Sequence, residues 1–306
     1  MDHRYSPTLR ALYERVCALN QKPIKVIEIK GDVDDSIEPL HDKEIVLKLH
    51  KGCSEDIIAH ELMHAVMHAE GYPDFFSITS PLSMKIRAIC AGDLDHIIIN
   101  DRLLELGYDA RKGFLKKADG YNNFLLMHSS ENADKQAILQ FGTLHQLIKY
   151  HYYIRDSSAQ TDILERFPEV VKYWQKLSSS IDSLPTKPQP QDMWNIGVEY
   201  ITLGDTICAD LGASIRISDL IGLEPVPLRR DQLNKPAKSM FIQSIEDAET
   251  VPATQGWILV RTFLIDTRIM VSAALTLADS AVVKEIDQLN IKELLRERNI
   301  RYILVD

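Results

Sequence analysis

Two histidines four positions apart, His60 and His64, enclose the sequence His-Glu-Leu-Met-His, and this motif constrains the chain more than any other feature. Residues four apart in an α-helix lie about one turn apart on the same face. Both imidazoles can therefore reach one metal ion at about 2.0–2.1 Å. Glu61 follows the first histidine, so its carboxylate can reach a water in the open position of that metal. The spacing predicts a zinc-binding helix with Glu61 as general base.

The residues around the motif favour a helix over positions 54–69. Ser54 is a plausible N-cap, acidic residues occupy the first turn, where the helix dipole favours them, and Gly71 with Pro73 closes the segment. The apolar positions suggest a buried helix: Ile57, Ile58, Leu62, Ala65 and Val66. Two histidines and a glutamate in a buried helix need a compensating partner, which a metal ion would provide.

The motif matches the signature of zincin metallopeptidases, and the preceding helix–strand–strand order resembles the compact minigluzincin core. This resemblance covers roughly residues 1–110. It implies a zinc cofactor, a peptide substrate paired along the strand at 44–50, and Glu61 as general base. The sequence departs from the family at the third ligand, because a gluzincin carries a glutamate on the second helix. The stretch expected to hold it reads Asp93-Leu94-Asp95-His96, and the longer metzincin signature is absent.

A catalytic zinc site normally has three protein ligands and one open position, so a third ligand must be found. A second helix, expected over residues 81–106, has an apolar face with a polar stripe formed by Asp93, His96 and Asn100. We take His96 as the third ligand, with Asp93 accepting its other imidazole N–H. Asp95 is the alternative ligand, and Asp93 also stays open as a ligand. His96 as a satisfied core histidine also stays open. The weaker candidates are His68, which continues the i+4 series and suits a supporting or surface role, and Glu70.

The residue that would stabilise a developing oxyanion is left open. Tyrosine and histidine are the usual types, because each can donate a hydrogen bond to negative charge. Three tyrosines are available, and each also suits a packing role: Tyr72, Tyr108 and Tyr121. A further aromatic run, His151-Tyr152-Tyr153, could line a cleft, but aromatic residues at helical spacing are typical of a core, so it receives no role.

The whole chain is expected to be an α+β protein that is predominantly helical. Its first part, 1–120, is a small zincin-like core with the order helix, strand, strand, helix, helix, in which 31–39 is an acidic loop. Residues 121–222 form a helical extension with segments near 132–154, 158–181 and 191–218. Residues 223–306 form a small α+β module that could bind a regulatory protein partner.

Charge and cysteine content limit the partners and the compartment. The 306 residues carry 35 Lys and Arg against 44 Asp and Glu, a formal net charge of −9, which argues against nucleic acid as the primary partner. The four cysteines are scattered without a Cys-x-x-Cys pair, so neither a disulfide framework nor a thiolate zinc knuckle is expected. The sequence contains no uninterrupted apolar run of about 18 residues, so we expect no membrane-spanning segment. We expect a cytoplasmic protein.

Two functional interpretations follow. The first is a zinc-dependent hydrolase, namely a regulatory endopeptidase that acts on a protein or peptide substrate through a metal-activated water. The alternative is a catalytically inactive, zinc-stabilised sensor or binding protein whose accessory regions carry the function. A third possibility is hydrolysis of a non-peptide amide or ester, which the same metal and base could perform.

Overall fold

The fold is described from a computed structural model of the 306-residue chain, and its regular structure is mostly helical. This agrees with the predicted α+β class with a helical majority. The structure describes residues 5–30, 36–38, 44–77, 86, 93–109, 132–224, 226–228, 230–236, 241–243, 258–264, 267–271, 288–293 and 302–304.

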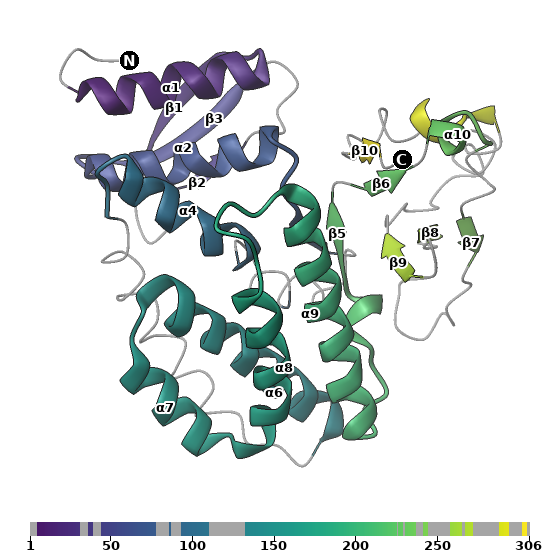
Figure 1. Ribbon diagram of the computed structural model, residues 1–306. Helices are drawn as coiled ribbons and strands as arrows, with labels where there is room; N and C mark the ends of the chain where they lie inside the picture. The colour runs from purple at the N-terminus through teal and green to yellow at the C-terminus, as the bar shows by residue number, and fades with distance from the viewer. Residues whose placement is uncertain are drawn as a thin grey trace. The chain divides into compact units, whose positions relative to one another are not determined.

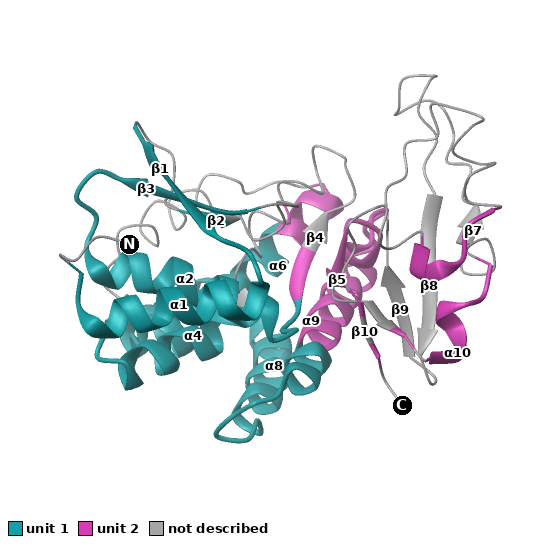
Figure 2. Cartoon of the chain, turned by 90° about the horizontal axis from the view of Figure 1, so that it is seen from above, with its two compact units in different colours: residues 1–73, 92–130, 139–196 teal, residues 74–91, 131–138, 197–306 magenta. Residues whose placement is uncertain are grey.

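The chain divides into two compact units, which Figure 2 distinguishes by colour. Unit 1 contains residues 1–73, 92–130 and 139–196, and unit 2 contains residues 74–91, 131–138 and 197–306. The predicted division at residues 120 and 222, with a partner-binding role for the last part, stays a prediction.

Unit 1 begins with helix α1, Pro7–Asn20, as the sequence predicts. Ser6 caps it, because its side-chain oxygen accepts a hydrogen bond from the Leu9 amide at 3.2 Å, and Pro7 occupies the first turn. Leu9, Leu12 and Val16 repeat at helical spacing and are fully buried or nearly so. Burial of a side chain of this kind contributes about 1.5–3 kcal/mol, which anchors α1 to the neighbouring helix.

A three-stranded sheet follows, with the order β1-β3-β2. Strands β1, Ile24–Ile29, and β3, Ile45–His50, are parallel, and β2, Ser36–Glu38, is antiparallel to β3. The prediction of a continuous loop over 31–39 is therefore wrong at 36–38. The expectation that a substrate pairs along 44–50 also fails for 46–48. These residues already pair with β1 on one side and β2 on the other.

Helix α2, Glu55–Ala69, lies between α1 and helix α4, Asp93–Glu105, and packs against both. The sheet covers one side of this helical layer (Figures 1 and 2). Ser54 is at the N-cap of α2, as predicted, but its side chain makes no capping hydrogen bond. The described part of the predicted helix 81–106 is helical from Asp93, and Ile86 is helical and buried. Close packing of α2 and α4 brings the two predicted ligand-bearing helices together.

The rest of the described part of unit 1 is mostly helical. The predicted segment near 132–154 is helix α6, Ala133–Ile148, whose residues up to 138 belong to unit 2, and it continues as the π-helical turn η1, Lys149–Ile154. The predicted segment at 158–181 is broken into α7, Ser157–Arg166, the short turn η2, Pro168–Val170, and α8, Val171–Asp182. Pro168 accounts for the break, because proline cannot donate to an α-helical ladder and restricts the residue before it.

Unit 2 combines one long helix with short strands. The helix predicted at 191–218 ends earlier: α9 spans Pro190–Asp210, with its first residues in unit 1, and is followed by the short turn η3, Ile217–Asp219. The remaining elements are β4 (Asp74–Ser77), β5 (Ile221–Glu224), β6 (Val226–Leu228), α10 (Arg230–Leu233), β7 (Phe241–Gln243), β8 (Ile258–Leu264), β9 (Thr267–Val271) and β10 (Tyr302–Leu304).

The strands of unit 2 pair in three small sheets. Strand β4 pairs with β5 and β6 pairs with β10, while β7, β8 and β9 form an antiparallel sheet. Within the described part of the chain, no helix is both long and apolar enough to cross a membrane.

Candidate metal centre

Helix α2 presents His60 and His64 from successive turns, as the spacing of the motif requires. Their Nε2 atoms lie 3.2 Å apart, and the two rings are almost perpendicular, with an interplanar angle of 89°. The surrounding side chains of α2 are buried, including Leu62, Met63 and Ala65. Because packing fixes the helix on both flanks, the two imidazoles are held in one orientation rather than left mobile at a surface.

Helix α4 supplies the third imidazole. The Nε2 atom of His96 lies 3.0 Å from the Nε2 atom of His60, and the two rings are stacked with an interplanar angle of 7°. Ligand atoms of His60, His64 and His96 all lie within 4.8 Å of one another. His60 and His96 are each only 9% exposed. The structure therefore brings together the three residues that the sequence selects as ligands.

The arrangement of the nitrogen atoms fits a bound cation better than a hydrogen-bonded cluster. A ring nitrogen carries either one N–H or one lone pair, so the Nε2 atom of His60 can satisfy only one of its two close nitrogen neighbours. A single metal ion would satisfy all three lone pairs at once. Two nitrogen ligands on a tetrahedral ion with bonds of 2.0–2.1 Å lie about 3.3 Å apart. The two separations of 3.0 and 3.2 Å need an opening of only a few tenths of an ångström.

Asp95 supports the cluster from α4. Its Oδ2 atom lies 3.4 Å from the Nδ1 atom of His64, on the opposite side of the ring from the convergent Nε2 atom. The side chains of Asp95 and His64 are 13% and 21% exposed, so the interaction is shielded from solvent. A carboxylate in this position orients the ring and favours the tautomer in which Nε2 carries the lone pair, which is the form that can bind a metal ion. Asp95, considered above as an alternative ligand, thus contacts the Nδ1 side of the His64 ring, away from Nε2.

Asp93 was expected to accept the second imidazole N–H of His96. Its backbone begins α4, but its side chain lies outside the described residues. The expectation therefore stays a prediction.

Tyr153 also lies at this site, although the sequence assigns it no role. It comes from the π-helical turn η1, and its ring centroid lies 5.3 Å from that of His96. Tyr153 is 1% exposed, so η1 closes this side of the histidine cluster with an aromatic wall. The only sequence signal was the aromatic run at 151–153, which does not distinguish a site wall from ordinary core packing.

Glu61 lies on α2 beside His60, and its side chain is half-buried. As the next residue along α2, its side chain projects about 100° around the helix axis from that of His60. Of the residues described, His60, His64 and His96 form the one group of three or more His, Cys, Asp or Glu residues with metal-binding spacing. His68 is half-buried on α2 and lies outside this group.

The weaker candidates have structural partners elsewhere. Glu70 forms ion pairs with Arg15 at 2.5 Å and with Arg102 at 2.6 Å. The hydroxyl of Tyr72 donates to the backbone oxygen of Pro188 at 2.7 Å. These contacts assign both residues to packing and hydrogen-bond roles rather than to the metal cluster.

Tyr108 supports the start of α2. Its hydroxyl contacts the Ser6 hydroxyl at 2.8 Å and donates to Glu55 at 3.4 Å, and the Ser6 amide donates to Glu55 at 2.8 Å. Hydrogen bonds from Ser6, aided by that from Tyr108, lower the pKa of Glu55 below its usual value. Burial raises the pKa of the Tyr108 hydroxyl. The last oxyanion candidate, Tyr121, lies outside the described residues.

Comparison with protein-family models, with curated proteins and with solved structures finds no match to this chain. The zincin resemblance therefore depends on the motif and on the geometry of the three histidines.

Proposed function

We propose that the chain is a zinc-dependent hydrolase, and specifically a peptidase, with His60, His64 and His96 as the zinc ligands. The observation that carries the proposal is the clustering of His60, His64 and His96 from α2 and α4. The Nε2 atoms lie 3.2 and 3.0 Å apart in the two pairs that share His60, and ligand atoms of all three residues lie within 4.8 Å of one another. Neutral imidazole suits zinc, and three protein ligands leave one coordination position open, which is typical of catalytic rather than structural zinc sites.

Glu61 is the proposed general base. When bound, zinc supplies Lewis acidity, which lowers the pKa of water to about 7 and polarises a substrate carbonyl. Glu61, the half-buried carboxylate next in sequence to His60, accepts the proton of the attacking water. The same carboxyl group then returns the proton to the leaving amine. Asp95 keeps the His64 ring oriented throughout, and Tyr153 excludes water from the His96 side.

The sheet suggests where a peptide would bind. Strand β2 is at the edge of the described sheet, pairs with β3 on one side, and packs near α2. An extended peptide can add to such an edge through main-chain hydrogen bonds. A peptide substrate would therefore pair with β2 and not with β3, because β3 already has a strand on each side.

The test compares Glu61→Gln with the natural protein, both loaded with zinc. A peptide library incubated with each protein, with cleavage products identified by mass spectrometry, should give products only for the natural protein. Glu61→Gln should retain one zinc per chain by elemental analysis, because it removes the base and leaves the ligands. Glu165→Gln, at an exposed position of α7, is the matched control and should cleave normally.

Two outcomes would overturn the proposal. Full turnover by Glu61→Gln would exclude the assigned base. Absence of any cleavage by the zinc-loaded natural protein, with Glu61→Gln retaining biological function in cells, would favour the zinc-stabilised sensor or binding protein instead.

A further inference from the structure

A cavity of about 700 Å³ lies within unit 1, and none of the three clustered histidines lines it. Its walls come from α2, α4, η1, and the segment at 184–190 that follows α8. Met63 and Ile97 contribute to the walls although they are sequence neighbours of His64 and His96. The cavity therefore lies against faces of α2 and α4 that differ from the faces carrying the three histidines. Its volume is in the range of small-molecule sites, about 300–1,000 Å³.

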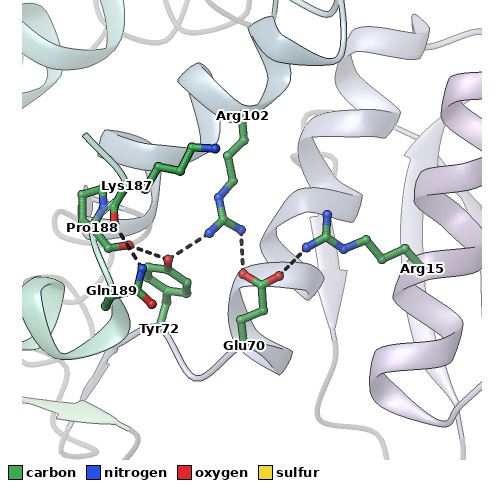
Figure 3. A network of polar contacts seen from close by, with 7 residues as sticks. All are labelled: Arg15, Glu70, Tyr72, Arg102, Lys187, Pro188 and Gln189. Atoms are coloured by element: carbon green, nitrogen blue, oxygen red, sulfur yellow. Dashed lines mark hydrogen bonds and ion pairs between the residues drawn. The ribbon is translucent and has the colours of Figure 1, made fainter. Parts of the chain in front are cut away.

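One wall of this cavity is a fixed polar network (Figure 3). The two carboxylate oxygens of Glu70 accept hydrogen bonds from different arginines, Arg15 at 2.5 Å and Arg102 at 2.6 Å. Arg102 also donates to the Tyr72 hydroxyl at 2.9 Å, and that hydroxyl donates to the backbone oxygen of Pro188. Two guanidinium charges therefore face one carboxylate, and the hydrogen bonds hold Arg102 in one orientation before any ligand arrives.

The charge count along the whole lining is positive. Four cationic side chains line the cavity (Arg15, Arg102, Arg155 and Lys187) against three carboxylates (Glu70, Asp101 and Glu105). Arg155 forms an ion pair with Asp101, so this pair contributes no net charge. Lys187 is exposed, and no ion pair of its ammonium group occurs within the described residues. In Figure 3 its side chain extends from the loop toward the side on which Arg102 lies.

The other walls are apolar and partly rigid. They are formed by aliphatic side chains, aromatic rings and prolines, among them Met63, Ile97, Tyr72, Pro185, Pro188 and Pro190. Three prolines in the segment at 184–190 restrict its backbone dihedral angles. The segment is also fixed by the Tyr72 bond to Pro188 and by the bond from the Gln189 amide to the Lys187 oxygen. The cavity thus combines a preorganised cationic end with apolar surfaces.

We propose that this cavity binds a small amphipathic anion, with its carboxylate, phosphate or sulfonate group beside Arg102 and Lys187 and its apolar body against Ile97 and the prolines. A guanidinium that is already oriented forms strong charge-assisted hydrogen bonds with such oxyanions. The apolar walls supply the area that holds the rest of the ligand. This site is separate from the histidine cluster and does not depend on the proposed hydrolase activity.

The direct test uses two dyes with the same aromatic skeleton on the full chain. Anilinonaphthalene sulfonate carries one anionic group, whereas phenylnaphthylamine is neutral. We expect the sulfonate to bind at one site per chain, at least about fivefold more tightly than the neutral dye, since only the sulfonate can form charge-assisted hydrogen bonds. Bound sulfonate should shift the methyl resonance of Met63 and leave that of the buried Met193, which does not line the cavity, unchanged.

Two charge-reversal variants complete the test. Lys187→Glu should weaken binding of the sulfonate about tenfold, because it replaces an attractive charge at the cavity with a repulsive one. Lys176→Glu makes the same change at an exposed lysine of α8 outside the cavity and should alter binding by less than about twofold. Absence of binding, equal affinity for the two dyes, equal effects of the two variants, or an unshifted Met63 methyl group would each overturn the proposal.

Discussion

The Nε2 atoms of His60 and His96 lie 3.0 Å apart although 36 positions separate these residues in the sequence. Their rings are stacked with an interplanar angle of 7°, so α2 and α4 hold the two imidazole planes nearly parallel. Such an approach of two imidazole nitrogen atoms is stabilised by a cation that both can bind. The relation makes the two helices interdependent, because each supplies part of one site.

Removal of either histidine should therefore cause a similar loss of zinc binding. We expect His60→Ala and His96→Ala each to lower zinc affinity by more than about 100-fold, beyond the usual effect of removing a supporting partner. The double variant should be little worse than either single variant, because two remaining ligands no longer form a site. Competition with a chromophoric chelator measures this affinity. His151→Ala is the control, since His151 bonds Gln160 on α7 and should not affect zinc.

The position of Asp95 leads to a second, graded prediction. Asp95→Asn should weaken zinc binding by about 10–100-fold, because the change removes the negative charge beside His64 Nδ1 but leaves all three ligands. Asp162→Asn, at an exposed residue of α7, should have no effect. The same chelator competition applies. A loss as large as that of His96→Ala would contradict the supporting role and indicate that Asp95 binds the metal directly.

The sequence was sufficient to select the three histidines that the structure clusters, because each is marked by local helical geometry. His60 and His64 are placed by a spacing of four, and His96 by a polar stripe on an otherwise apolar face. The order of the strands could not be derived in this way. Three residues of β2 are too few to show alternation, and their antiparallel pairing with β3 depends on the tertiary fold.

Tyr153 and Glu55 illustrate a second limit of prediction from the sequence. Tyr153 reaches His96 only because η1 packs against α4, and a run of aromatic residues has the same appearance in any helical core. At the start of α2, the sequence suggested a capping role for the Ser54 side chain. The structure instead stabilises this end through Glu55, which binds Ser6 and Tyr108 from distant parts of the chain. Such contacts between remote residues leave no periodic signal.

The contacts of Glu55 predict a pH-dependent stability. Hydrogen bonds from Ser6 lower its pKa in the folded protein below the value of 4.5 expected when unfolded. The contribution is therefore fully present above pH 4.5 and is lost as the pH falls through the lower, folded-state pKa. Glu55→Gln should reduce the free energy of unfolding by about 1 kcal/mol at pH 7, since the group is partly exposed.

Urea denaturation at pH 7 and at pH 3.5 measures this effect. The difference between Glu55→Gln and the natural protein should be smaller at the lower pH, where the natural carboxylate begins to protonate. Glu165→Gln should show no such difference at either pH. A constant loss across this range would mean that Glu55 acts through packing and not through its charge.

Gln146 in α6 presents a buried amide group. The residue is 0% exposed, and neither its amide nitrogen nor its amide oxygen has a hydrogen-bond partner within the described chain. A buried amide without a partner costs about 1–3 kcal/mol. Methionine has a similar length and no amide, so Gln146→Met should raise the free energy of unfolding by about 1–2 kcal/mol.

Chemical denaturation of Gln146→Met beside Gln140→Met tests this expectation. Gln140 lies in the same helix and is 5% exposed, and neither of its amide atoms belongs to the described set of buried atoms without a partner. Its replacement should therefore give a smaller gain. A loss of stability in Gln146→Met would show that the amide is satisfied in solution, for which an ordered water with two to four polar partners is the simplest agent. In that case the interior of unit 1 would contain a hydrated site one helical turn before Tyr150 and two before Tyr153, the residue that packs on His96.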